Sequence, residues 1–128
     1  MTQQEIIEFW SSEAREALQV AEHLFEKEDY SYALFFGHLA IEKIIKAVLV
    51  KKTGQTAPRS HNLLRLAKAA GLEISQEQQH HLIRITAFNL EARYPDYKGG
   101  FRTKCTASFT AGELEKIKEV FAWLKSML

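Results

Sequence analysis

The sequence is poor in the residues that cross-link small domains or interrupt helices. Among 128 residues there is one cysteine, Cys105, which excludes an internal disulfide framework and a zinc site built from several cysteines. There are two prolines and six glycines, and the breaks they predict fall at 54–58, 71 and 95–100. No apolar run approaches the roughly 20 residues that span a membrane. Long uninterrupted intervals therefore remain for helices.

Excess charge of either sign is also lacking. Lys plus Arg is 17 and Asp plus Glu is 16, a net charge of +1, so any nucleic-acid contact requires a local patch rather than a uniformly basic surface. The N-terminus lacks a basic segment followed by an apolar one, which predicts no secretory signal. One unpaired thiol suits a reducing compartment. We expect one cytoplasmic domain, residues 1–128, that does not enter a membrane.

Apolar residues recur at helical spacing along most of the chain, and no segment alternates with a period of two. The pattern predicts an all-α fold: an up-and-down bundle of four long antiparallel helices with one short extra helix in a connection. The expected helices, the short one being third, cover about 6–27, 32–52, 61–70, 76–90 and 111–127. The stretch 91–108, with Pro95, Gly99 and Gly100, is expected to be a long loop, and such loops are often functional.

Side chains that favour helix ends mark the expected boundaries. Gly71 is expected to end the third helix. The expected N-caps are Asp29 or Ser31, Ser60, Ser75 paired with Gln78 in a capping box, and Thr110. In the fourth helix, the residues available for burial are Leu82, Ile83, Ile85, Thr86 and Leu90. Segment 32–52 is apolar on almost every side, which places it at the centre of the core or against a second copy.

A polar notch interrupts this central helix. His38, Glu42 and Lys46 are spaced by four and stack along one side of it, with Lys43 at the edge. Buried charges must be paired, with each other or with a ligand. One interpretation is a notch that faces a cleft or a dimer axis, with Lys43 or Lys46 available to a phosphate. The other is a self-satisfied pair of charges, with Lys46 reaching solvent along its stem.

The expected loop carries a second candidate site. Its residues 91–104 combine cations with aromatic side chains, a composition that can hold phosphate and stack a base. They are Arg93, Lys98, Arg102 and Lys104 against Glu91 and Asp96, with Tyr94, Tyr97 and Phe101. The alternative is an ordered loop whose aromatic residues cover the end of the bundle. No phosphate-binding glycine loop of the Walker type is present.

Three smaller features complete the candidates. His61, expected at the first turn of the third helix beside Arg59, is either an anion contact or a residue that anchors the linker. No metal is predicted, because His38 with Glu42 forms at most half a site and no H-E-x-x-H pattern occurs. Basic neighbours could lower the pKa of Cys105, but an incidental thiol is the simpler interpretation.

The order of these features resembles the HEPN domain, the higher-eukaryote and prokaryote nucleotide-binding family. The resemblance runs from about Trp10 to Leu124. The motifs that carry it are Asp29-Tyr30, Ala40-x-Glu42-Lys43-x-x-Lys46-Ala47, His61-Asn62-Leu63 and Arg93-Tyr94-Pro95-Asp96. It implies an up-and-down helical bundle, commonly a homodimer, often paired with a small nucleotidyltransferase in toxin–antitoxin-like modules. One branch of the family cleaves RNA with an Arg, four to six residues and a His, and this sequence lacks that motif.

The expected function is therefore a non-catalytic module that binds a nucleotide, an RNA or a nucleotidyltransferase partner, with no cofactor. The expected binding residues are Arg93, Tyr94, Asp96, Lys98, Lys43 and Lys46. The alternative is a ribonuclease toxin in which His61 or His38 acts as acid–base and Arg93 stabilises the phosphate. The binding module is expected to be a homodimer through apolar surface that includes parts of the central helix. A third possibility is a purely structural interaction protein, in which the polar notch is an interface and the loop only packs on the bundle.

Overall fold

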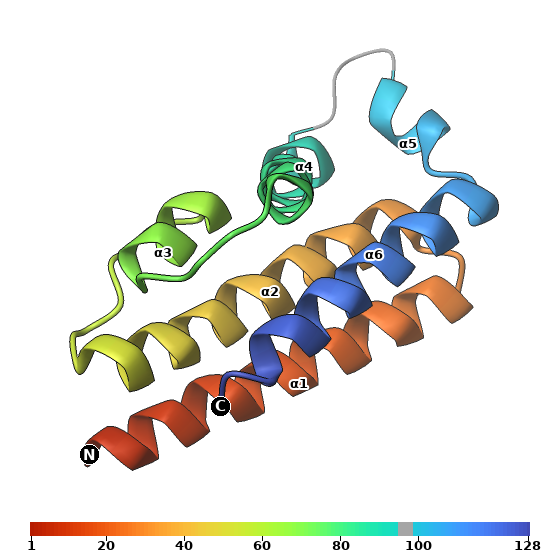
Figure 1. Cartoon of the computed structure of the whole chain (residues 1–128). Helices are drawn as coiled ribbons and strands as arrows, with labels where there is room; N and C mark the ends of the chain where they lie inside the picture. The colour runs from red at the N-terminus through yellow and green to blue at the C-terminus, as the bar shows by residue number, and fades with distance from the viewer. Residues whose placement is uncertain (95–98) are drawn as a thin grey trace.

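The computed structural model describes residues 1–94 and 99–128, and every regular element in these two segments is an α-helix (Figure 1). The all-α bundle of four long helices predicted from the sequence is confirmed, and the short third helix lies in the connection between the second and fourth. The helices are α1 (Gln3–Glu26), α2 (Tyr30–Thr53), α3 (Leu63–Ala69), α4 (Gln76–Arg93), α5 (Gly100–Lys104) and α6 (Ala107–Lys125).

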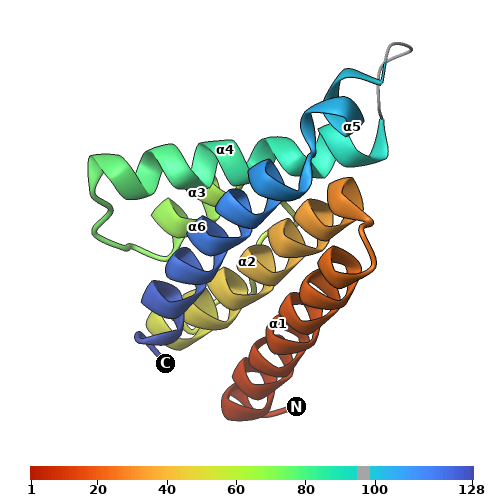
Figure 2. The same cartoon turned by 90° about the vertical axis from the view of Figure 1, so that its right-hand side faces the viewer.

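Helix α2 lies at the centre of the bundle. Helix α1 runs antiparallel along it, α6 packs on it, and α4 crosses it at a steep angle with α3 beside it (Figures 1 and 2). Leu34, Ile41, Ile44 and Ile45 of α2 have no exposed surface, because other helices of the same chain cover them. Most apolar side chains of α2 are therefore buried within the single chain, and few remain exposed for contact with a second copy.

The stretch 91–108, expected to be a long loop, contains parts of three helices. Helix α4 continues to Arg93, α5 occupies Gly100–Lys104, and α6 begins at Ala107. The N-cap of α6 is Thr106, whose side chain accepts from the amide of Phe109, so the expected cap Thr110 is wrong. Thr110 is instead fully buried inside the first turns of α6.

Helix α4 buries a narrower face than expected. Leu82, Ile85 and Phe88 are buried, whereas Ile83 and Leu90 are exposed, so their predicted burial is wrong. The reason lies in the packing: α4 rests on α2, α3 and α6 from one side only. Its outer side is left to the solvent in the single chain.

Side chains that favour helix ends predicted the start of α4 and the end of α3 correctly. Ser75 and Gln78 form the predicted capping box, and Gly71 ends α3 with a left-handed backbone at φ +73°. Asp29 is the N-cap of α2 but makes no side-chain capping bond. The cap of α3 is Asn62, not Ser60, so His61 precedes the helix rather than lying in its first turn.

No helix in the two described segments is both long enough and apolar enough to cross a membrane.

Gly37 of α2 packs closely against α6. A Cβ at Gly37 would lie 2.6 Å from Cδ1 of the fully buried Ile117, whereas a Cβ at Gly112 meets nothing within 4 Å. Overpacking costs about 1–3 kcal/mol, more than the roughly 1 kcal/mol that alanine gains over glycine in a helix. We expect Gly37→Ala to lower the free energy of unfolding in urea and Gly112→Ala to raise it by about 1 kcal/mol. Adding Ile117→Val should restore the Gly37→Ala variant; no recovery would contradict the assigned contact.

Candidate functional site

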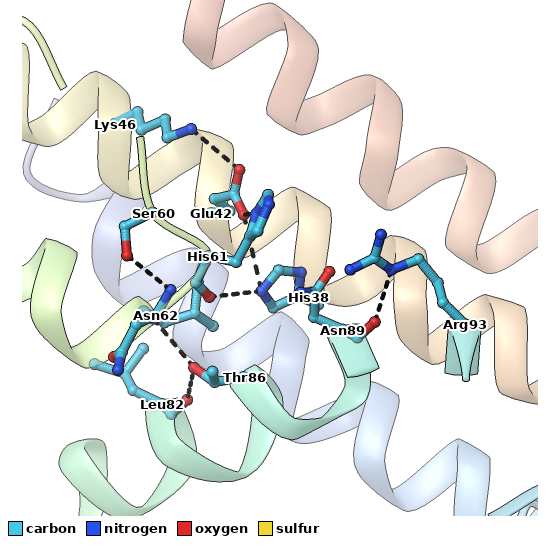
Figure 3. A network of polar contacts seen from close by, with 11 residues as sticks. His38, Glu42, Lys46, Ser60, His61, Asn62, Leu82, Thr86, Asn89 and Arg93 are labelled. Atoms are coloured by element: carbon cyan, nitrogen blue, oxygen red, sulfur yellow. Dashed lines mark hydrogen bonds and ion pairs between the residues drawn. The ribbon is translucent and has the colours of Figure 1, made fainter. Parts of the chain in front are cut away.

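The polar notch predicted on α2 is one connected network around the Glu42 carboxylate (Figure 3). Glu42 is almost fully buried, yet both of its oxygens are bonded. Oε2 accepts from Nζ of Lys46 at 3.1 Å, and Oε1 accepts from Nδ1 of His61 at 2.8 Å. Buried carboxylates are stable only when they are satisfied in this way. The pairing of Glu42 with Lys46 agrees with one of the two interpretations from the sequence. The second partner of Glu42, His61, comes from another segment, and Lys46 is largely buried rather than extended into solvent.

His61 belongs to an extended segment that is fixed at several points. Nε2 of His38 donates to the carbonyl of His61 at 3.1 Å, while the His61 ring bonds to Glu42. Two residues further on, the Leu63 amide donates to Oγ1 of Thr86 on α4 at 3.1 Å. The segment before α3 is therefore held to α2 and α4 together, and this sets the orientation of the imidazole.

The His61 ring presents one nitrogen to solvent. Its Nδ1 donates to Glu42, so in the neutral ring Nε2 is the unprotonated nitrogen, and 62% of the side chain is exposed. No partner for Nε2 is found in the described segments. A carboxylate behind an imidazole fixes its tautomer and leaves Nε2 as the acceptor, an arrangement that can receive a proton or a hydrogen bond from a ligand.

His38 is the buried member of the network. Burial lowers the pKa of His38 below its usual 6.5, an effect opposed by the bond to the His61 carbonyl and by Glu42. Electrostatic interactions with His61 and Arg93 lower the pKa of His38 further. The neutral ring donates through Nε2, which leaves Nδ1 buried without a partner. Since it has no exposed surface, His38 acts by holding the His61 carbonyl rather than by touching a ligand.

The two lysines expected to meet phosphate are both occupied. Nζ of Lys43 is 3.0 Å from the Glu13 carboxylate on α1. Lys46 is bonded to Glu42 and lies over the Trp10 ring, 5.0 Å from its centroid. A phosphate would have to displace these partners, which makes both lysines weaker candidates than the cations at the other end of α2.

Arg93 is the centre of a cation–aromatic cluster at the end of α4. Its Nε donates to the carbonyl of Asn89 at 2.9 Å, and its guanidinium carbon lies 5.7 Å from the Phe35 ring and 5.2 Å from the Tyr94 ring. The Tyr94 side is open, since Tyr94 is 67% exposed. The side chain makes no ion pair within the described residues, so its terminal nitrogens are available to an anion.

A second arginine extends this cluster across the start of α2. Arg102 of α5 lies over the Tyr32 ring at 5.9 Å and bonds its hydroxyl at 3.4 Å. Helix α5 is anchored by Phe101, which is buried and packs on Phe88 of α4. We call Tyr32, Phe35, Arg93, Tyr94 and Arg102 the arginine–aromatic surface.

Sequence reasoning missed Tyr32 and Phe35 as members of this surface. The sequence pattern assigned both residues to the central helix only. Their spacing of three residues places them on the same side of its first turns, which is the signal that could have identified them. Asp96 and Lys98, the remaining predicted binding residues, lie outside the described residues. Tyr97 and Pro95 lie there too.

The network and the arginine–aromatic surface follow one another along α2. Figure 3 shows Lys46, Glu42, His61, His38, Asn89 and Arg93 in a row on the same side of the helix. The effect of Arg93 on the pKa of His38 reflects this proximity. An extended ligand on this side would meet a free arginine at one end and the exposed His61 nitrogen further along.

Two other candidates from the sequence fare differently. Burial raises the pKa of Cys105 to about 11, so the thiol is unreactive at neutral pH, in line with the interpretation of an incidental thiol and against a lowering by basic neighbours. In the segments 1–94 and 99–128, no group of three or more His, Cys, Asp and Glu side chains is placed to hold a metal ion.

The lowered pKa of His38 predicts a pH effect on stability. Below pH 6.5 the unfolded chain binds a proton at His38 that the folded chain resists, so the contribution of His38 is complete above 6.5 and is lost as the pH falls further. Urea unfolding at pH 7.5 and 5.5 should show a smaller loss of stability in His38→Gln than in the unchanged protein. The control His23→Gln, at an exposed position, should keep the full loss. Equal losses in all three would contradict the assignment.

Comparison with known proteins agrees with this architecture. The structure is similar to the crystal structure of TT1696 from Thermus thermophilus, with a TM-score of 0.82, 20% sequence identity, and coverage of 95% of this chain and 98% of that one. At this identity the likeness concerns the fold. No curated protein matches the sequence. The family model of the HEPN domain matches residues 7–127. The chain therefore belongs to the HEPN domain family.

Proposed function

We propose that this protein binds a nucleotide or a single-stranded RNA on the arginine–aromatic surface, without chemical conversion of the ligand. Membership of the HEPN family indicates a nucleotide- or RNA-related function at a coarser level. The observation that carries the proposal is the state of Arg93: a stacked guanidinium, exposed, with no acidic partner in the described segments.

The distribution of paired and unpaired cations supports this location. Lys43, Lys46 and Arg84 each face a carboxylate, whereas Arg93 and Arg102 face aromatic rings. An arginine held flat against rings is preorganised, so less side-chain entropy is lost when its free nitrogens bind a phosphate. The chain has almost no net charge, and local cations of this kind are what a phosphate would meet.

The aromatic rings supply the second contact that a nucleotide needs. Tyr94 and Tyr32 are 67% and 43% exposed, far more than a tyrosine that only packs the core. Stacking of a base on such a ring is worth about 1–3 kcal/mol and tolerates any base. We therefore expect weak sequence preference and an affinity that falls as salt is raised.

The partner of the module belongs to the same proposal. We infer that the protein acts in the cytoplasm as a homodimer and works with a small nucleotidyltransferase in a toxin–antitoxin-like pair, as the family resemblance implies. A nucleotide carried by such an enzyme could then reach the arginine–aromatic surface. This role and direct RNA binding use the same surface, so one set of variants tests both.

Calorimetric titration with ATP, GTP and a short single-stranded RNA at low salt tests the proposal. Arg93→Ala should weaken binding about tenfold or more, equivalent to about 1.4 kcal/mol or more. Arg15→Ala is the matched control, because Arg15 is an exposed arginine on α1 whose recorded side-chain contact is Ser11. Equal affinities for the two variants, or no heat with any ligand, would overturn the proposed site. Capture of a nucleotidyltransferase unaffected by Arg93→Ala would instead favour a purely structural interaction protein.

A second candidate function is RNA cleavage with residues other than the family motif. The observation in its favour is the 2.8 Å bond between Glu42 and Nδ1 of His61, which leaves Nε2 exposed as a proton acceptor. In this scheme His61 takes the proton of a ribose 2′-hydroxyl, the 2′-oxygen bonds to phosphorus, and the 5′-oxygen leaves and is protonated by water. Arg93, further along the same row, would face the charged phosphate.

His61→Ala separates the two candidates. If RNA is cleaved through His61, the variant should lose cleavage of a labelled single-stranded RNA by a factor of about 100 or more, the usual contribution of a general base. His23→Ala removes an exposed histidine of α1 and should leave the rate unchanged. If the unchanged protein leaves the RNA intact while binding it, the ribonuclease candidate fails and the binding module remains.

A further inference from the structure

A small cavity lies at the end of the bundle where α1 begins and α2 ends. Figure 1 shows these two ends side by side, with the connection to α3 leaving from the same place. The cavity has a volume of about 230 Å³ between α1, α2 and residues 54–57 of that connection. Ile6, Trp10 and Val50 form the apolar part of its lining, and Gln3, Gln55 and Thr56 form the polar part. We call it the Trp10 cavity.

The Trp10 cavity is suited to an uncharged ligand. Among the described residues, no side chain that lines it carries a charge. The hollow between α1 and α6 differs in this respect, because Arg15, Glu22 and Lys125 are part of its lining. A phosphate, carboxylate or ammonium group that entered the Trp10 cavity would lose its water without gaining an ion pair, which is costly.

The indole ring of Trp10 is a fixed wall of this cavity. Nζ of Lys46 lies over the ring, 5.0 Å from its centroid, and the Phe9 ring packs against it in a T-shaped arrangement with the centroids 5.3 Å apart. Trp10 also packs on a small apolar cluster that contains Val50. A ring held from several directions loses little freedom when a ligand stacks on it, so less free energy is spent on ordering it.

The size and the polar lining of the cavity fit a nucleobase. A volume of about 230 Å³ lies between the roughly 150 Å³ that holds benzene and the roughly 300 Å³ or more of pockets for drug-sized ligands. The hydrogen bond of Gln55 in the described segments runs from its backbone amide, so its side-chain amide keeps a donor beside an acceptor. Bases present matching pairs along their edges, which glutamine can recognise. The ligand class is therefore a flat, uncharged heterocycle.

The Trp10 cavity continues the row of polar residues on α2. Glu42, Lys46 and Val50 follow one another at spacings of four, which places them on one side of the helix. Figure 3 shows Arg93 at one end of the row and Lys46 at the other. Lys46 contacts the ring that walls the cavity, and Val50 lines it. A ligand that extends from Arg93 along this side of α2 reaches the cavity at the far end of the row.

The distance between the two sites is too long for a mononucleotide. Phe35, which lies against Arg93, and Val50, which lines the cavity, are 15 residues apart on α2. At about 1.5 Å per residue this separation is about 22 Å along the helix. A short oligonucleotide can contact both sites, whereas ATP occupies only one. Two contacts within one molecule raise the affinity above that of either contact alone.

We propose that the Trp10 cavity takes one base of a single-stranded RNA whose phosphate is held at the arginine–aromatic surface. The inference rests on the proposed function and adds a second subsite to it. The base stacks on the indole ring of Trp10, and the side-chain amide of Gln55 bonds the edge of the base. Single-stranded RNA therefore binds more tightly than ATP, and a free nucleoside, which lacks the phosphate contact, binds most weakly.

Filling the cavity tests this subsite. Ala57 lines it at a half-buried position, so Ala57→Leu occupies part of its volume and leaves Trp10 and Arg93 unchanged. Ala111→Leu is the matched control, because Ala111 is a half-buried alanine that lines a different cavity, between α1 and α6. In calorimetric titrations, Ala57→Leu should weaken RNA binding about tenfold through the loss of one stacked base, and should leave ATP affinity unchanged. The control should bind both ligands like the unchanged protein.

The outcomes distinguish the subsite from the proposed function. If Arg93→Ala weakens RNA binding and Ala57→Leu does not, the subsite is overturned and the proposed function stands. If neither variant weakens RNA binding, both are overturned. If Ala57→Leu weakens ATP and RNA binding equally, the subsite is also overturned, because a cavity that ATP does not reach cannot affect its affinity.

Fluorescence tests whether the base stacks on Trp10 itself. The chain has two tryptophans, so Trp123→Phe on α6 leaves Trp10 as its one indole. Single-stranded RNA should then quench the emission saturably, whereas ATP and adenosine at the same concentrations should not. Quenching by adenosine as readily as by RNA would assign the cavity to a free nucleoside and overturn the link to RNA. An emission change on raising the protein concentration alone would assign the cavity to a second copy and overturn the subsite.

Discussion

The buried carboxylate of Glu42 is the constraint on which the arrangement of the site depends. It lies in the middle of the most apolar helix of the chain, where an unpaired charge would cost several kcal/mol. Lys46 can reach it from the next turn, but its second oxygen needs a partner from elsewhere. His61 provides that partner and brings the segment before α3 onto α2. The connection after α2 is thereby fixed by a polar requirement of the core rather than by apolar packing alone.

The cations beside α2 fall into two groups. One group is Lys43 and Lys46 in the second half of α2, which form ion pairs with the carboxylates of Glu13 and Glu42. The other group is Arg93 at the end of α4 and Arg102 of α5, which rest on aromatic rings and keep donors free. A nearly neutral chain can therefore still offer a local surface for phosphate. We propose the ligand site at Arg93 and Arg102 because these two side chains do not pair with carboxylates of the described residues.

The sequence predicted the fold well because its signals were local and complete. The central helix α2, apolar on almost every side, and the Ser75–Gln78 capping box were confirmed, since both depend on residues within one or two turns. The errors have a common cause. Thr106 rather than Thr110 caps α6, and Asn62 rather than Ser60 caps α3, because several adjacent side chains could cap and tertiary contacts decide among them. The exposure of Ile83 and Leu90 depends on which side of α4 meets its neighbours, which spacing alone does not specify.

The candidate site was partly predictable for the same reason. The spacing of His38, Glu42 and Lys46 predicted the notch, but the bond from His61 crosses 19 residues and requires the folded connection. We propose that a ligand contacts the arginine–aromatic surface rather than the notch of His38, Glu42 and Lys46. NMR of the isotope-labelled protein during addition of a short single-stranded RNA distinguishes the two locations. We expect the largest shifts at the Arg93 and Arg102 side chains and the Tyr94 amide. Saturable shifts confined to other helices would contradict this proposal.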